Sequence, residues 1–318
     1  MLSRVAGALY RLGRLVERAD HLARVTDVHV TLVLDRGREA EPDFWPHVLE
    51  LAGLDPIRAA DYQSALSTAV EGGRGSLRES IHRARGEAMA VRPSLSTEAY
   101  EGLNELYWTL DARISEANFH DFSVRVQRGV VLLYGLVDET MAHDEAWEFL
   151  RLGRQLERAR SVVRLATSKL DWLNKGDDAV EWAAVLRSCT AFEAYRWRFS
   201  DAITALRVAE FVLLDQTLPH SARRAVSEAL AGVRRIDGPG TRSGPYRLLG
   251  RLSALFEYTD AREVVDDPSG FARAYASAAA HVEDSLSATY FRPTRVPLGQ
   301  PAVAPPIWSS SEQSNQQQ

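Results

Sequence analysis

The sequence predicts an all-α protein, a multi-helix bundle of about ten or more helices built from two similar halves. Apolar residues recur at the helical spacing of three and four residues along nearly the whole chain. Alternating runs of β-branched residues, which mark strands, are hard to find. One motif occurs twice, 140 residues apart, as LGRLVERAD (12–20) and LGRQLERAR (152–160), and a long-period repeat of this kind indicates two related halves.

Helix breakers divide the chain into its expected elements. A first long helix carries the first motif copy, a helix begins near Ser96 after Pro93, and a third helix carries the second copy. Clusters of Gly, Pro, Asn and Asp mark the ends of helices because these residues favour turns. The main breakers are RGREAEPDFWP (36–46), EGGRG (71–75), LNKGDD (173–178), TLPHS (217–221) and RIDGPGTRSGPY (235–246).

We expect one helical domain over residues 1–291, with pseudo-repeats over about 1–140 and 141–291. The segment 292–318 is rich in Pro, Ser and Gln, and a disordered tail is expected there because such a composition cannot bury enough apolar surface.

Composition excludes several classes of protein. The chain has 318 residues, 45% of them hydrophobic, and a net charge of −5, which argues against a nucleic-acid binder. No apolar run approaches the roughly 20 residues that span a bilayer, and no signal peptide is recognisable. Cys189 is the only cysteine, so no internal disulfide can form, and we expect a cytoplasmic protein. A homo-oligomer is compatible with these features.

The repeat keeps its polar face better than its apolar face. Aligning residues 8–30 with 148–170 gives eight identities in 23 positions, and six of them lie off the apolar stripe. A solvated ion pair is worth only about 0.2–0.5 kcal/mol, too little to preserve such a face. We therefore expect this face to be buried between the halves or to line a cleft, with each glutamate bridging to an arginine three residues away on its own helix. The residues concerned are Arg14, Glu17, Arg18, Arg154, Glu157 and Arg158.

Two interpretations of this face stay open. It is either a structural ion-pair network or a site whose arginines bind a carboxylate or phosphate. Arg24 and Arg164 repeat in the same way, and FEAYRWR (192–198) brings Glu193 and Arg196 together, so these four are secondary candidates.

No metal site or cofactor site is predicted. A di-iron helical bundle needs two E-x-x-H pairs, and only Glu79 and His82 form one. The phosphate-loop, Rossmann and nucleophile-elbow motifs do not occur. We expect most of the eight histidines at the surface or at helix caps, and Cys189 in the core.

The stretch MLSRVAGALYRLGRLVERADHLARVTDVH (1–29) resembles the opening of the bacterial alpha-E family, a helical domain of unknown function with an E-R motif. The resemblance covers roughly residues 1–291 and implies an all-α fold. It departs from the family pattern at Gly86, Glu87, Met89 and His220, and it leaves Arg85 and Arg92 as further secondary candidates. The other stretches that carry it are ARGEAMAVR (84–92), LNELYW (103–108), DEAWEFLRLGRQLERAR (144–160), AFEAYRWRF (191–199) and LPHSARRAV (218–226).

Members of the alpha-E family tend to be encoded beside, or fused to, an ATP-grasp ligase, often with a transglutaminase-like peptidase. The resemblance therefore implies an accessory, non-catalytic partner of an ATP-grasp amide ligase, with the Arg/Glu face holding an anionic peptide. One alternative is an enzyme of peptide modification that uses Glu17 or Glu157 as acid–base beside an arginine clamp. The other alternative is an interaction protein in which this face only holds the fold together.

Overall fold

The computed structural model describes residues 1–36, 43–56, 61–111, 114–115, 118–174, 176–199 and 202–292. Within these ranges the chain forms fourteen α-helices and no β-strand, so the predicted all-α class is confirmed. Residues 293–318, where we predict a disordered tail, lie outside the described residues.

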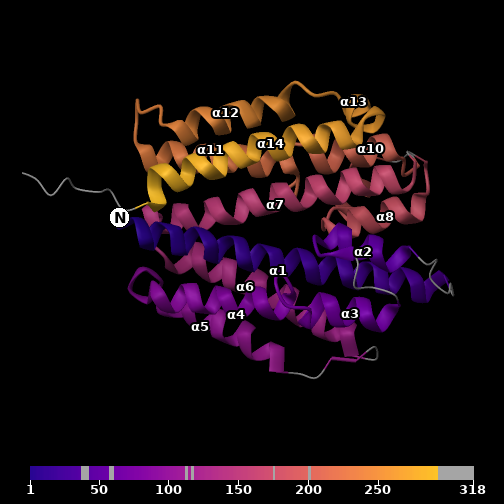
Figure 1. Cartoon of the computed structure of the whole chain (residues 1–318), viewed down its shortest axis with the longest axis horizontal. Helices are drawn as coiled ribbons and strands as arrows, with labels where there is room; N and C mark the ends of the chain where they lie inside the picture. The colour runs from indigo at the N-terminus through magenta and orange to yellow at the C-terminus, as the bar shows by residue number, and fades with distance from the viewer. Residues whose placement is uncertain are drawn as a thin grey trace, which may run out of the picture.

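The first half of the chain surrounds one long helix that carries the first motif copy. This helix, α1, lies in the middle of the molecule, with α3 to α6 on one side of it and α2 against both α1 and α7 (Figure 1). They are α1 (Ser3–Arg36), α2 (Phe44–Ala52), α3 (Tyr62–Glu71), α4 (Leu77–Ala90), α5 (Thr97–Trp108) and α6 (Phe119–Thr140). Short 3-10 turns follow at Arg92–Ser94 and Thr109–Asp111.

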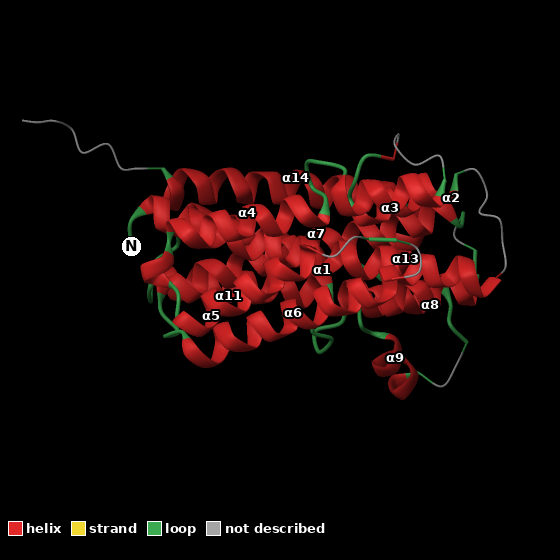
Figure 2. Cartoon of the chain, turned by 90° about the horizontal axis from the view of Figure 1, so that it is seen from below, coloured by secondary structure: helices red, strands yellow, loops and turns green. Residues whose placement is uncertain are grey.

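The second half surrounds α7, which carries the second motif copy and lies directly beside α1 (Figure 1). Its short helix α9 projects from the edge of the bundle (Figure 2). The helices are α7 (Glu145–Trp172), α8 (Ala179–Ser188), α9 (Phe192–Arg198), α10 (Ala205–Ala209), α11 (Ala222–Asp237), α12 (Gly244–Glu257), α13 (Ala261–Asp266) and α14 (Pro268–Leu286). Two π-helical turns lie at Glu210–Leu214 and Ser287–Phe291.

The two long helices have similar surroundings. The helix α1 packs against α4 and α6, and α7 packs against α11 and α14. The remaining long helix of each half, α5 or α12, completes a four-helix group. This agreement supports the predicted repeat around α1 and α7, while the similarity of the halves beyond these helices stays a prediction.

The predicted breakers end or begin helices where expected. The helix α1 ends at Arg36, α3 ends at Glu71, and α7 ends at Trp172. Ser96 begins α5 because its Oγ accepts a hydrogen bond from the Ala99 amide (3.1 Å), which satisfies a free donor of the first turn. No described helix is long and apolar enough to cross a membrane.

The predicted apolar stripes of α1 and α7 are buried in the hydrophobic core. Residues such as Leu9, Ala19, Ala159 and Ala166 are fully buried. The helix α7 is also buried on its polar face, where Glu157 and Arg158 are 2% and 5% exposed. The prediction that the Arg/Glu face is covered is therefore confirmed for Glu17, Glu157 and Arg158, whereas Arg14, Arg18 and Arg154 stay partly exposed.

Candidate functional site

The helices α1 and α7 run parallel and touch at two glycines. Both begin at the same end, where the Met1 amino group lies 2.9 Å from a Glu145 carboxylate oxygen. A Cβ atom added at Gly13 would collide with the carbonyl oxygen of Leu150, and one added at Gly153 would collide with that of Tyr10. The two collisions are equivalent under exchange of the motif copies, so the G of each motif is needed for this close backbone approach.

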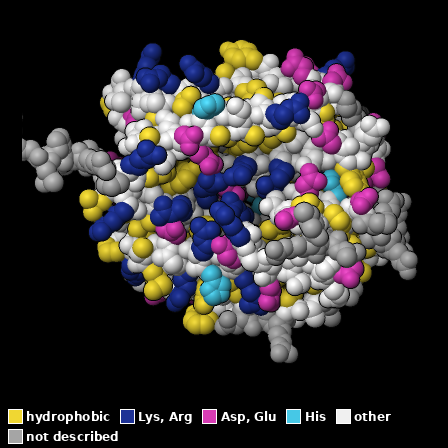
Figure 3. All heavy atoms as spheres, viewed as in Figure 1, with side chains coloured by type: hydrophobic (Ala, Val, Ile, Leu, Met, Phe, Trp, Pro, Cys, Tyr) yellow, Lys and Arg dark blue, Asp and Glu magenta, His cyan; other side chains and the backbone are white. Residues whose placement is uncertain are grey.

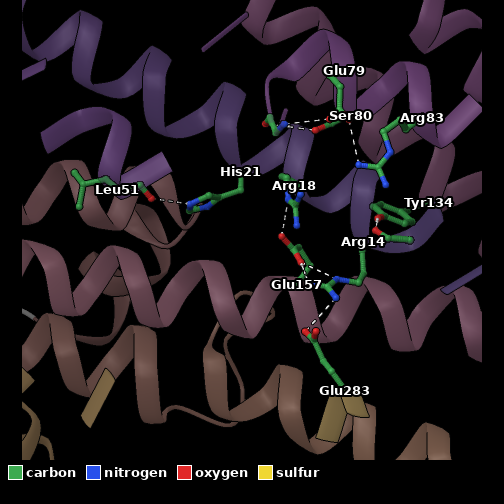
Figure 4. A network of polar contacts seen from close by, with 12 residues as sticks. Arg14, Arg18, His21, Leu51, Glu79, Ser80, Arg83, Tyr134, Glu157 and Glu283 are labelled. Carbon is green, nitrogen blue, oxygen red and sulfur yellow. Dashed lines mark hydrogen bonds and ion pairs between the residues drawn. The ribbon is translucent and has the colours of Figure 1, made fainter. Parts of the chain in front are cut away.

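The close approach allows each glutamate to bind the arginines of the other helix. Glu157 accepts hydrogen bonds from Arg14 Nη2 (2.7 Å) and Arg18 Nε (2.8 Å). Glu17 accepts from Arg158 Nε (2.5 Å) and Nη2 (2.9 Å), and Arg154 Nε lies 3.5 Å from Glu17 Oε2. Figure 4 shows Glu157 between Arg14 and Arg18, which reach it from α1. The six motif residues thus form two equivalent clusters across one interface.

The predicted bridge within each helix is wrong. The described contacts of Glu17 and Glu157 join α1 to α7, although an arginine lies three residues earlier on each glutamate's own helix. The glycine contact brings the neighbouring helix within reach of the side chains. A guanidinium from the opposite helix can then bind a carboxylate in the geometry that its planar fork prefers.

These ion pairs lower the pKa values of both glutamates. Burial alone would raise the pKa of Glu157, but the guanidinium groups of Arg14 and Arg18 lower it to about 2. Burial alone would also raise the pKa of Glu17, but the positive charges of Arg158 and Arg154 hold that pKa below its usual value. A carboxylate with such a low pKa is a weak base at neutral pH. The geometry therefore favours a structural role for both glutamates over acid–base catalysis.

Aromatic and carbonyl groups complete the two clusters. The Tyr134 hydroxyl donates to the Gly13 carbonyl (3.1 Å), and the Arg154 guanidinium stacks on the Tyr134 ring at 3.7 Å. Arg158 also donates to the Pro219 carbonyl (3.2 Å), so the loop before α11 covers the Glu17 cluster. Arg14 Nη1 lies 3.0 Å from Glu283 of α14, which borders the Glu157 cluster (Figure 4).

The secondary candidates divide into two groups. Arg24 and Arg164 lie about two turns beyond the glutamates on α1 and α7, next to the two clusters. Arg24 binds Asp20 (2.8 Å) and Gln127 (3.2 Å), whereas Arg164 forms no ion pair or side-chain hydrogen bond with a described residue. This difference is the main asymmetry between the two copies.

The other secondary candidates do not join the clusters. Arg85 donates to Asn104 (2.8 Å) and stacks on Tyr107, and Arg92 donates to the Leu95 carbonyl (3.2 Å). Glu193 and Arg196 lie on the projecting helix α9, where neither forms an ion pair with a described residue. Their neighbour Arg198 binds Asp215 (2.5 Å) instead. The predicted grouping of Glu193 and Arg196 as a site is not supported.

Cys189 and three of the histidines lie in the interior of the protein. Cys189 is buried, as predicted. Four of the eight histidines are exposed and one is half-buried, in line with the expectation for most of them, whereas three lie in the core. Burial lowers the pKa values of His21, His29 and His47 to about 4, 3 and 2, so these rings are neutral at neutral pH. In the described part of the chain, no three His, Cys, Asp or Glu side chains are grouped as metal ligands.

Sequence reasoning missed several residues beside the clusters. Tyr134, Tyr275 and Glu283 come from helices without the motif, and no local pattern marks them. One signal was available in the repeat itself. Position 20 of the first copy is an aspartate and the equivalent position 160 is an arginine, so the partner of Arg24 has no counterpart near Arg164.

Comparison with known proteins agrees with the repeated motif. A family described as a predicted α-helical domain with a conserved ER motif, alpha-E, matches residues 1–291. The chain is 24% identical over 341 aligned residues to the uncharacterized protein Rv2567 of Mycobacterium tuberculosis, and equally to the uncharacterized protein Mb2597 of Mycobacterium bovis. Each alignment covers 97% of this chain and 38% of the relative, so the chain spans well under half the length of these relatives. No solved structure matches the chain.

Proposed function

Because the chain belongs to the alpha-E family, we propose that it is a non-catalytic helical partner of an ATP-grasp amide ligase. The observation that carries the proposal is the state of the motif glutamates. Glu17 and Glu157 each accept hydrogen bonds from arginines of the neighbouring helix, and their lowered pKa values leave them unsuited to proton transfer. The E-R motifs then act by joining the halves into one rigid body.

The length of the curated relatives supports an action beside another protein segment. The aligned region makes up 38% of the length of each relative, so in these relatives a domain of this kind is joined to a long additional stretch. The outer helices of the domain are the available docking surface for the ligase, since α1 and α7 are buried between the halves.

The proposed complex acts in the cytoplasm, because an ATP-grasp ligase consumes ATP there. The absence of a membrane-spanning helix from the described residues is compatible with this location. A transglutaminase-like peptidase is the second proposed partner, acting on the peptide that the ligase makes or extends.

Affinity purification of the tagged chain from its native cells at low ionic strength tests the proposal. We expect stoichiometric recovery of an ATP-grasp protein, identified by mass spectrometry, and none from the untagged strain. The purified chain should then change the rate of ADP release by that ligase. Recovery of the folded chain alone, together with unchanged ADP release, would contradict the proposal.

An enzyme of peptide modification is the alternative, and Glu→Gln substitution at position 17 or 157 separates it from a scaffold. A scaffold loses stability or ligase binding when Glu17 or Glu157 is replaced, because the arginines facing it lose their counter-charge. An enzyme would lose turnover while it stayed folded. Thermal unfolding and product formation, measured on the same samples, therefore distinguish the two functions.

A further inference from the structure

Arg164 is a partly buried cation that forms no ion pair with a described residue, and the Glu157 carboxylate, which binds Arg14 and Arg18, attracts it only from a distance. Its guanidinium packs so closely on Gly53, at the end of α2, that a Cβ atom there would collide with it. Its Nε is enclosed and donates to no acceptor, and burial lowers the pKa of Arg164 to about 10. A charge held in this way is costly unless an anion neutralises it.

The equivalent residue of the first copy shows what is missing. Arg24 occupies the matching position of α1 and binds Asp20, one helical turn earlier, at 2.8 Å. The residue one turn before Arg164 is Arg160, which is exposed and forms no ion pair with a described residue. An acidic position in one copy is therefore a basic position in the other, and two arginines lie together where one ion pair would have formed.

These two arginines line a cavity between α7 and α14. The cavity has a volume of about 380 Å³, which is within the size range of small-molecule sites. Its opposite wall is the small apolar face of α14, and Tyr275 and Glu283 border it. Glu283 lies 3.0 Å from Arg14 Nη1 and forms no ion pair with Arg160 or Arg164. Figure 3 shows basic side chains gathered around a hollow near the middle of the molecular face that it draws.

We propose that this cavity binds the carboxylate of a small ligand with a short apolar body, such as the C-terminal end of a peptide. Arg160 and Arg164 hold the carboxylate through charge-assisted hydrogen bonds. Ala272, Ala276 and Ala279 pack against the body. An alanine wall offers no hydrogen-bond donor and stabilises only a ligand with apolar groups, which favours a peptide end over a bare phosphate ion. The choice of a peptide rests on the proposed function, whereas the anion site itself does not require a ligase.

Calorimetric titration of the full chain with N-acetyl-Ala-Ala tests the site, with the C-terminal amide of the same peptide and inorganic phosphate as comparison probes. We expect the free acid to bind and the amide to bind about tenfold or more weakly, because the amide lacks the charge. Arg160→Asp should abolish binding of the acid, because the new carboxylate would pair with Arg164 as Asp20 pairs with Arg24. Arg4→Asp changes the net charge equally at an exposed position of α1 and should leave binding unchanged.

Arg164→Gln provides a second variant that removes the cation without supplying a partner, and it should also weaken binding by about tenfold or more. Equal affinity for acid and amide, no detectable binding of the acid, or unchanged binding by Arg160→Asp would each overturn the proposal. Binding of phosphate without binding of the acid would overturn the peptide assignment. Ligase recovery with Arg160→Asp is measured separately, so loss of the anion site and loss of the partnership give different results.

Discussion

Replacing Glu157 by Gln tests whether the E-R clusters hold the two halves together. Gln keeps the size of the side chain but removes the negative charge that faces Arg14 and Arg18. The carboxylate is 2% exposed, so water cannot compensate for the loss. Its pKa is lowered from 4.5 to about 2, which corresponds to about 3 kcal/mol of stabilisation from the charged form. Breaking a buried ion pair costs about 3–5 kcal/mol in other proteins, so we expect a loss of about 3 kcal/mol.

Urea unfolding followed by circular dichroism measures this loss at pH 7. The matched control is Glu283→Gln. Glu283 also contacts Arg14, at 3.0 Å, but its side chain is 39% exposed. An ion pair at such a position is worth less than about 1 kcal/mol because solvent screens it. The two variants remove the same charge near the same arginine, so burial is the main difference between them.

The pH dependence of the stability difference between the wild type and Glu157→Gln independently tests whether the carboxylate charge causes that difference. Because the folded pKa of Glu157 is lowered, its contribution to stability is complete above pH 4.5 and is lost as the pH falls toward 2. The gap between the wild type and Glu157→Gln should therefore narrow from about 3 kcal/mol at pH 5 to about 2 kcal/mol at pH 3.5. A loss below 1 kcal/mol at pH 7, or a loss equal to that of the control, would refute the argument that the cluster stabilises the interface.

Three further predictions concern the helix contact and the buried titratable groups. Gly13→Ala should cost about 3 kcal/mol in urea unfolding because the Cβ meets a backbone carbonyl, whereas Gly135→Ala, at an exposed helical position with open space, should stabilise by about 0.5–1 kcal/mol. Equal effects of the two substitutions would contradict the close contact. Lowering the pH from 7 to 5 should reduce the free energy of unfolding by about 2 kcal/mol per buried histidine, because the folded pKa values lie below 6.5 and the unfolded chain takes up protons first. A free energy of unfolding in urea that did not change between pH 7 and pH 5 would contradict this prediction. The histidines are His21, His29 and His47. Cys189 is buried with its pKa raised to about 12, so iodoacetamide should label it only when urea unfolds the chain.

The sequence by itself determined the fold class, most helix boundaries and the burial of the Arg/Glu face. Helical spacing and breakers are local properties, because each turn is formed by residues three or four apart. Burial of the face followed from the repeat. Glu17 and Glu157 persist in both copies off the apolar stripe, and a solvated face has little reason to keep such residues.

The tertiary structure alone decided which side chains meet. The apolar periodicity of a helix does not determine whether α1 and α7 run parallel. It also does not determine which turn of α1 faces which turn of α7. The parallel contact at Gly13 and Gly153 places Glu17 beside Arg158, and Glu157 beside Arg14 and Arg18, which replaces the pairing predicted within each helix. The cavity at Arg164 depends likewise on α14, a helix with no copy of the motif. Local periodicity therefore predicts which helix faces are buried. The direction and register of the helices determine which ion pairs form and leave Arg164 without one.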